Sequence, residues 1–151
     1  MKRRSLEHLD CSMARALDVV GEWWTLMVVR DVFLGMHRFD VICDDLGISR
    51  NILTDRLQTL VAHDVLEKRP VEGGHHEYHL TEKGRALSDV VIALWRWGEQ
   101  WETVPQGAPL RLEHVCGHDP QAHLVCSTCG EPVTMRTARI RRNRRVTARR
   151  D

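Results

Sequence analysis

Apolar residues recur along the chain in blocks that predict a mainly helical protein. Residues 23–34 are apolar almost throughout, and the run stops at Gly35, a residue typical of the position just after a helix. A buried strand has the same apolar pattern, but the length of the run and its stop at Gly35 favour a core helix. A short helix over residues 13–20 is expected before it, and another over residues 39–45 after it.

Residues 49–62 have the pattern of an amphipathic helix. Ser49 is a good N-cap because its hydroxyl can accept a hydrogen bond from the first helical turn, and Ile48 and Leu53 have the spacing of a hydrophobic staple. The apolar face of this helix consists of Leu53, Leu57, Leu60 and Val61. Gly47 permits a tight turn between this helix and the preceding one. The two helices together predict a helix-turn-helix motif.

A β-hairpin is expected directly after the second of these helices. Residues 65–70 and 77–80 have the composition of short strands, and the loop over residues 71–76 is centred on two glycines. A hairpin in this position is the wing of a winged helix-turn-helix. The expected fold is therefore mainly α with a small β-hairpin wing.

A long helix capped by Thr81 is expected over residues 81–101. One apolar stripe on it consists of Leu87, Val90, Val91, Leu94, Gly98 and Trp101, while Ile92 and Trp95 fall outside this stripe. A helix that is apolar on more than one face needs more than one packing partner. We therefore predict a homodimer interface that includes Val91, Ile92 and Trp95. The alternative is that the second face holds only scattered surface apolar residues.

Composition divides the 151 residues into four parts. We expect a helical domain over residues 8–102, a linker with paired prolines over residues 103–109, a Cys/His-rich module over residues 110–134, and a disordered Arg-rich tail over residues 135–151. Residues 1–134 hold 14 basic against 20 acidic residues, whereas the tail holds 8 arginines against one aspartate. The tail can therefore supply the salt-dependent attraction to DNA that the acidic body lacks, or be an inert, soluble end.

Targeting signals and membrane spans are not expected. No run of about 18 apolar residues is present, and the basic N-terminus leads into no apolar segment. The five cysteines are too few and too unevenly placed for a disulfide scaffold, so a cytoplasmic protein without a membrane partner is expected.

Several short motifs, in order along the chain, carry a family resemblance. They are Cys11–Gly21 with Trp24-Thr25-Leu26 and Arg30-Asp31, Arg38-Phe39, Ile48-Ser49, Leu53-Thr54, Arg56-Leu57, Tyr78-His79-Leu80-Thr81-Glu82-Lys83-Gly84 and Arg96-Trp97-Gly98. Over residues 8–102 the chain resembles HxlR-type transcriptional regulators, which are related to the MarR-like group. The resemblance implies a dimeric winged helix-turn-helix protein that binds operator DNA as a repressor or an activator, and we expect a repressor. Glu22-Trp23 departs from the family's usual Gly-Lys at this place.

The DNA-binding residues are expected on the second helix of the motif and on the wing. A recognition helix places side chains near its N-terminus in the major groove. Arg50 can reach a guanine edge and Asn51 an adenine edge. The other expected DNA contacts are Arg38, Ser49, Thr54, Arg56 and Gln58 from the helices, and Lys68, Arg69, His75 and His76 from the wing. Arg56 has an equally weighted alternative, a structural ion pair. An ordinary solvated helix face is the alternative for the other residues of this helix, and a solvated turn is the alternative for His75 and His76.

The Cys/His-rich module has part of a zinc-ribbon pattern. Cys126-x-x-Cys129-Gly130 is a zinc-knuckle sequence, and Cys116-Gly117 is its expected counterpart. His114 and His118 compete for the fourth ligand position, with His123 as a weaker candidate. We expect structural zinc, because so short a segment can hardly bury its own core. The alternative is a metal-free hairpin in which Cys126 and Cys129 are free or disulfide-bonded.

Two questions of function stay open at this stage. The resemblance implies a response to electrophiles or redox stress through Cys11, or to a small ligand; alternatively Cys11 is a small buried side chain near the dimer interface. Cys43 is expected only to pack. The rival functions are a protein-interaction adaptor that uses the zinc ribbon and a small zinc-dependent enzyme. No phosphate loop, dinucleotide fingerprint or nucleophile elbow is present, so we expect no catalytic activity.

Overall fold

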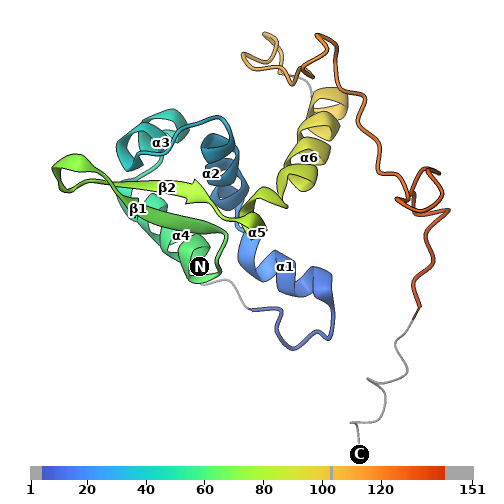
Figure 1. Ribbon diagram of the computed structural model, residues 1–151, viewed down its shortest axis with the longest axis horizontal. Helices are drawn as coiled ribbons and strands as arrows, with labels where there is room; N and C mark the ends of the chain where they lie inside the picture. The colour runs from blue at the N-terminus through green and yellow to red at the C-terminus, as the bar shows by residue number, and fades with distance from the viewer. Residues whose placement is uncertain (1–4, 103, 142–151) are drawn as a thin grey trace, which may run out of the picture. The chain divides into compact units, whose positions relative to one another are not determined.

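The computed structural model describes residues 5–102 and 104–141 and divides the chain into two compact units, Met1–Glu102 and Thr103–Asp151. The elements of the first unit, in chain order, are α1 (Ser12–Val20), α2 (Trp23–Phe33), α3 (Phe39–Leu46), α4 (Arg50–Ala62), β1 (Leu66–Pro70), a 3-10 turn (Glu72–Gly74), β2 (His76–Leu80), α5 (Glu82–Arg85) and α6 (Ser88–Trp101) (Figure 1). The predicted fold class, mainly α with a small hairpin, is confirmed.

The hydrophobic core lies between α2, α3, α4 and β1. Its buried members are Val28, Val29, Val32, Ile42, Ile48, Leu53, Leu57, Leu60, Val65 and Leu66. Each such side chain contributes about 1.5–3 kcal/mol when it leaves water, so this cluster is the main stabilising feature of the first unit. The prediction of a core helix after residue 22 is confirmed, although Trp23 at its start is 88% exposed.

The turn between α3 and α4 follows the predicted local rules. Gly47 ends α3 in the left-handed conformation, with φ of 61°. Ser49 caps α4, since its hydroxyl accepts a hydrogen bond from the Ile52 amide at 3.3 Å. Ile48 and Leu53 are both buried in the core, as a hydrophobic staple requires. Cys43 donates to the Ile48 carbonyl at 3.1 Å, so its thiol serves this turn. The helix-turn-helix prediction is confirmed.

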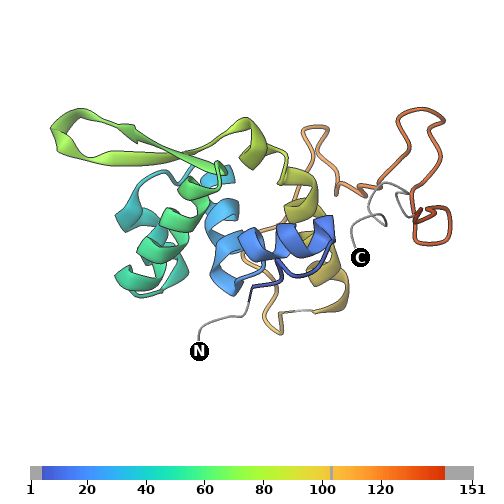
Figure 2. The ribbon, with the colours of Figure 1, turned by 90° about the horizontal axis from the view of Figure 1, so that it is seen from below.

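The wing is an antiparallel hairpin whose register runs from Leu66 opposite Leu80 to Pro70 opposite His76. Gly73 and Gly74, with φ of 83° and 75°, form the turn at its tip. In Figures 1 and 2 this tip projects past α3 and α4. Arg38 pairs with Glu77 as an isolated bridge, which adds a short third segment beside β2. The sequence analysis did not predict this third segment.

The prediction of one helix over residues 81–101 is wrong, because the chain forms two helices there. Thr81 caps α5 as expected, but the Leu87 amide bonds to the Gly84 carbonyl, three residues back, and α6 starts afresh at Ser88. Tertiary contacts explain the break. A Cβ atom at Gly84 would lie 2.1 Å from the Val65 carbonyl oxygen, and Lys83 donates to the His63 carbonyl at 2.6 Å. These contacts hold α5 against the end of the wing while α6 departs from it.

The second unit consists of turns rather than helices over its described residues. One turn covers residues 114–118, another covers residues 126–130, and Val125 forms an isolated bridge with Pro132. The amides of Cys129 and Thr128 hydrogen-bond to the Cys126 sulfur and lower the pKa of its thiol. Part of the predicted disordered tail, residues 142–151, lies outside the described residues. In the part of the chain that the structure describes, no helix is long and apolar enough to cross a membrane.

Candidate nucleic-acid interface

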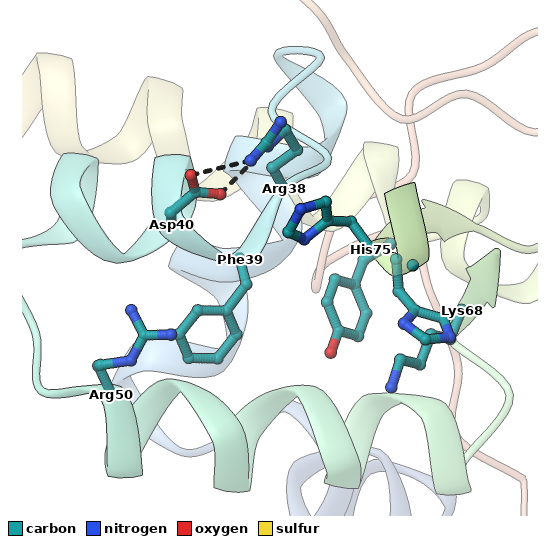
Figure 3. A pocket seen from close by; sticks show the side chains of 9 residues that line it. Arg38, Phe39, Asp40, Arg50, Lys68 and His75 are labelled. Atoms are coloured by element: carbon teal, nitrogen blue, oxygen red, sulfur yellow. Dashed lines mark hydrogen bonds and ion pairs between the residues drawn. The ribbon is translucent and has the colours of Figure 1, made fainter. Parts of the chain in front are cut away.

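A groove of about 410 Å³ lies between the N-terminal ends of α3 and α4 and the wing. Its lining consists of Arg38, Phe39, Asp40, Arg50, Lys68, Gly74, His75, His76 and Tyr78. Five of these residues, Arg38, Arg50, Lys68, His75 and His76, are predicted DNA contacts that come from separate parts of the chain. The fold therefore brings basic and imidazole side chains from two helix ends and one hairpin to a single concave surface (Figure 3).

Arg50 is the first residue of α4 and stacks on an aromatic ring. Its guanidinium carbon lies 4.6 Å from the centroid of the Phe39 ring, within the range of a cation–π contact (Figure 3). Within residues 5–102 as described, no carboxylate pairs with Arg50. The contact with Phe39 holds the side chain near the helix N-terminus, and its positive charge stays available to a ligand.

Arg38 is also exposed in the groove, but a neighbouring carboxylate offsets its charge. Its guanidinium donates two hydrogen bonds of 3.2 Å to the Asp40 carboxylate. These bonds, together with the Asp40 backbone amide, lower the pKa of Asp40, so the carboxylate stays ionised at neutral pH. A phosphate that approached Arg38 would meet this negative charge as well.

The two faces of the wing differ in charge. Lys68 lies opposite Tyr78, and both line the groove. Arg69 lies on the other face, because side chains alternate along a strand, and it pairs with Glu67 there. Lys68 has no carboxylate partner among the described residues. The structure therefore separates the two predicted wing cations: Lys68 faces the groove and Arg69 is neutralised outside it.

The hydroxyl groups of α4 have internal partners. Ser49 accepts the capping bond described above, and Thr54 donates to the Arg50 carbonyl at 2.8 Å. Asn51 and Gln58 are exposed on the same helix. The roles predicted for these four side chains at DNA stay predictions. Asn51, next to Arg50, is the best placed of them for a base edge.

Arg56 takes part in an ion-pair network, which favours the structural alternative for this residue. Its guanidinium pairs with Asp55 and lies 3.4 Å from the Glu22 carboxylate, and its side chain is only 18% exposed. Glu22 also accepts a hydrogen bond from the Trp24 amide at 3.1 Å, so it caps α2. The departure from the family pattern at Glu22 thus joins the start of α2 to the middle of α4.

Two histidine rings pack together on and beside β2, next to the groove residue Tyr78, and no local sequence pattern predicted them. His37 and His79 stack with 4.2 Å between ring centroids, and His79 Nε2 lies 2.9 Å from a Glu77 carboxylate oxygen. The Tyr78 amide donates to the His37 carbonyl at 2.8 Å. Burial raises the pKa of Tyr78, so its phenol stays a hydrogen-bond donor in the groove. The expected hairpin register could have indicated Tyr78 as a groove residue, because it places the side chains of Tyr78 and Lys68 on the same face of the wing.

Arg30 pairs with a buried carboxylate within α2 and also joins α2 to α3 through Asp45. Asp31 is fully buried, and Arg30 Nε donates to its carboxylate at 2.8 Å, while Arg30 Nη2 reaches Asp45 at 2.7 Å. One Asp31 oxygen lacks a hydrogen-bond partner among the described residues. Burial raises the pKa of Asp31 more than Arg30 lowers it.

The predicted dimer residues are half-buried within the chain. Val91 packs against the core, and Ile92 and Trp95 are partly covered. The most exposed apolar side chains of α6 are instead Val90, Leu94, Trp97 and Trp101, at helical spacing along one stripe. Cys11, the predicted redox sensor, is exposed at the N-cap position of α1.

The candidate zinc ligands lie in the two turns of the second unit. Cys116, Cys126 and Cys129 are free thiols, and His114 and His118 flank Cys116. Among residues 5–102 and 104–141, no three His, Cys, Asp or Glu side chains converge as a metal site. The metal therefore stays a prediction.

Comparison with known proteins identifies the family. Residues 19–106 match the HxlR-like helix-turn-helix family. The HTH-type transcriptional regulator Rv3095 of Mycobacterium tuberculosis is 40% identical over 128 residues, which are 83% of this chain and 81% of the relative. The crystal structure of PA1607, a candidate transcription factor, matches with a TM-score of 0.82 and 38% identity over 93% of this chain and 100% of that chain.

One further similar structure is that of a protein named as a redox regulator. The redox regulator HypR in its oxidized form matches with a TM-score of 0.58 and 29% identity over 62% of this chain and 100% of that chain. These similarities are to transcription regulators, not to enzymes. The chain therefore belongs to the HxlR-like helix-turn-helix family of transcriptional regulators.

Proposed function

We propose that this chain is a homodimeric repressor that reads operator DNA with the N-terminal end of α4 and holds the DNA backbone with the wing. The observation that carries the proposal is the groove, where Arg50 and Lys68 reach one surface from a helix end and a hairpin. A recognition helix uses its first residues at base edges, and a wing cation contacts phosphate. Arg50 is the base reader and Lys68 the phosphate contact.

The distribution of charge supports this assignment. Acidic residues outnumber basic ones over residues 1–134, which opposes binding to a polyanion. Ion pairs neutralise Arg30, Arg56 and Arg69 away from the groove. The unpaired cations Arg50 and Lys68 instead lie inside the groove, where a phosphate backbone would find a locally positive surface.

Sequence-specific binding is tested by selection from a pool of random-sequence DNA duplexes. We expect an enriched palindrome whose half-sites lie about 10 base pairs apart, or a multiple of that, because a two-fold dimer presents two recognition helices. Fluorescence anisotropy then compares the selected duplex with a scrambled one, and the selected duplex should bind about 10³-fold more tightly or better. Failure to enrich any sequence contradicts the proposal.

Repression is tested separately from binding. The selected operator is placed over a promoter in a purified transcription assay. Transcript levels should fall as the protein is added, because a dimer on the operator excludes the polymerase. Rising transcript levels would identify an activator instead.

Dimer formation is supported by the exposed stripe on α6. Val90, Leu94, Trp97 and Trp101 are large apolar side chains on one side of a surface helix, and such a row marks a contact surface. We place this stripe at the interface between two copies, whereas the half-buried Ile92 and Trp95 lie on the opposite side of α6. The second copy would remove the stripe from water and set the distance between the two α4 helices.

Analytical ultracentrifugation tests this interface. Leu94→Glu should shift the dimer towards monomers, because the interface would then bury an unpaired charge. Val41→Glu is the matched control, since Val41 is a similarly exposed apolar residue on α3. A monomeric wild type, or equal behaviour of the two variants, would refute this interface.

A response to electrophiles through Cys11 is the third part of the proposal. The thiol is exposed at the N-cap position of α1, and a reactive cysteine must be accessible. The likeness to the redox regulator HypR supports a thiol-based response. With a quinone, the Cys11 sulfur bonds to a ring carbon, and the thiol proton and the displaced ring proton end on the two hydroquinone oxygens.

Treatment with 1,4-benzoquinone tests this response. The treated wild type should release the selected duplex, and Cys11→Ser should retain it. Cys43→Ser is the control and should behave as wild type, because Cys43 serves the turn before α4. Release from treated Cys11→Ser would exclude Cys11 as the sensor.

A further inference from the structure

The turn at residues 126–130 has the backbone of a thiolate-binding knuckle. The Gly130 amide donates to the Cys126 carbonyl at 2.8 Å, and Gly130 has a φ of 75°, which reverses the chain directly after Cys129. The amides of Cys129 and Thr128 point at the Cys126 sulfur. The turn thus presents Cys126 and Cys129 as a Cys-x-x-Cys pair, which is half of a typical structural zinc site.

The turn at residues 114–118 repeats this construction with a histidine and a cysteine. The Gly117 amide donates to the His114 carbonyl at 2.8 Å, and Gly117 has a φ of 82°. His114 Nδ1 lies 3.0 Å from Cys116 Sγ. Each turn therefore ends on a left-handed glycine and presents a pair of metal-binding side chains.

The second unit has no apolar core among its described residues. Every side chain of residues 104–141 is exposed or half-exposed, and Val115 is 98% exposed. A segment of this size without a core needs a cross-link to hold one conformation. The five cysteines are free thiols, so disulfide bonds do not supply that link in this structure.

From these three observations we propose that Cys116, Cys126, Cys129 and His114 bind one structural zinc ion that joins the two turns. Three sulfurs and one nitrogen are a common ligand set for a closed, tetrahedral zinc site. Binding exchanges the three thiol protons for the metal, and the released protons go to solvent. Among the described residues no three candidate ligands lie together, so metal binding would have to bring these four side chains to one point.

The geometry assigns the nitrogen ligand to His114 rather than His118. In a tetrahedral zinc site, bonds of about 2.3 Å to sulfur and 2.0 Å to nitrogen place the two ligand atoms about 3.5 Å apart. The 3.0 Å between His114 Nδ1 and Cys116 Sγ is close to this separation. His118 Nδ1 instead lies 3.1 Å from the Cys116 carbonyl oxygen, which leaves only its Nε2 open to a metal, and no contact of the described residues places that atom beside a cysteine sulfur.

Metal content of the full chain tests the site. The protein is purified with a reductant and without chelator, incubated with zinc sulfate, dialysed and measured by inductively coupled plasma mass spectrometry. We expect about one zinc per chain for wild type, and well below one for Cys126→Ser and for His114→Ala. The matched controls Cys43→Ser and His118→Ala should keep the metal. Cobalt provides a second readout, since a tetrahedral thiolate site gives thiolate-to-cobalt absorption that Cys126→Ser should abolish.

Folding of the variants is checked independently. Circular dichroism should be unchanged, because the described helices lie within residues 12–101 and the substituted ligands lie outside them. Wild type well below one zinc per chain, or a Cys126→Ser variant that keeps its zinc, would overturn the site. Loss of two thiols in a thiol titration, without zinc, would show the metal-free disulfide hairpin instead. Zinc loss in His118→Ala but not in His114→Ala would overturn the choice of His114.

Discussion

Arg50→Ala is the substitution that most directly separates base reading from backbone attraction. Arg50 has no carboxylate partner within the described residues, and its guanidinium stacks on the Phe39 ring. Its removal therefore breaks no ion pair among the described residues and loses only the contact with the Phe39 ring, so the free energy of unfolding should change by no more than about 1 kcal/mol. Any larger effect on DNA binding then comes from the interface itself.

The magnitude follows from the contact that Arg50 can make. A guanidinium that forms two hydrogen bonds with one guanine contributes about 1–3 kcal/mol of discrimination. The variant should therefore bind the selected duplex about 5- to 150-fold more weakly, at 1.4 kcal/mol for each factor of ten. Binding to a scrambled duplex, which depends on phosphate contacts, should fall much less.

Phe39→Leu tests how Arg50 is held. The ring contributes about 0.5–1 kcal/mol at an exposed cation–π contact, so the variant should lose about 2- to 5-fold in affinity for the selected duplex. In the double variant the two losses should not add, because both act through Arg50. Leucine keeps much of the volume that Phe39 packs against the core.

Fluorescence anisotropy with both duplexes at one salt concentration measures these effects. Repeating the selection with the Arg50→Ala protein adds a direct readout, since the base pair that Arg50 reads should lose its preference. Equal losses on the selected and scrambled duplexes would refute the argument. Arg50 would then be a phosphate contact, and base reading would have to come from Asn51 or another exposed residue of α4.

Three further predictions concern charge. Lys68→Ala should weaken binding to all duplexes alike and reduce the slope of log affinity against log salt by about 1. Arg69→Ala should change this slope much less, because the charge of Arg69 is paired outside the groove. Equal slopes for the two variants would contradict the difference between the two faces of the wing. Asp40→Asn should strengthen binding to scrambled DNA at low salt, because it releases Arg38 from its carboxylate partner; unchanged affinity would show that Arg38 does not face DNA. Because the pKa of Asp31 is raised, the folded protein binds the carboxyl proton of Asp31 more tightly than the unfolded chain does. The stability that this proton contributes is therefore present below the ordinary aspartate pKa of 3.8, and it is lost as the pH rises through the pKa of Asp31 in the folded protein. Urea unfolding across this range should therefore show a fall in stability with pH that Asp31→Asn removes; a wild type and variant with parallel pH profiles would argue against it.

Local rules were sufficient where neighbouring residues decide the structure. The N-cap at Ser49, the turn at Gly47 and the apolar face of α4 are short-range features, and each is present as predicted. The glycines of the wing tip likewise form the expected turn, because their backbone conformation is open to few other residues.

Local rules were insufficient where distant segments meet. The long helix expected over residues 81–101 breaks because Gly84 packs against the Val65 carbonyl, a contact that no helix propensity contains. The pairing of Arg56 with Glu22, across 34 positions of the chain, favours the structural alternative for Arg56, and no local pattern contains it. The bridge between Arg38 and Glu77 also joins distant positions of the chain, and it adds the third segment of the wing.

The amino-acid sequence by itself determined the fold class and the helix-turn-helix with its wing, because apolar periodicity, caps and turn residues act over a few neighbouring positions, and it supplied a set of candidate cations for DNA. Only the tertiary structure decided which of those cations are available. It paired Arg38, Arg56 and Arg69 with carboxylates and left Arg50 and Lys68 unpaired within the described residues. The physical reason is that the charge a ligand meets depends on partners within a few ångströms in space, and the packing of α2, α3, α4 and the wing places those partners.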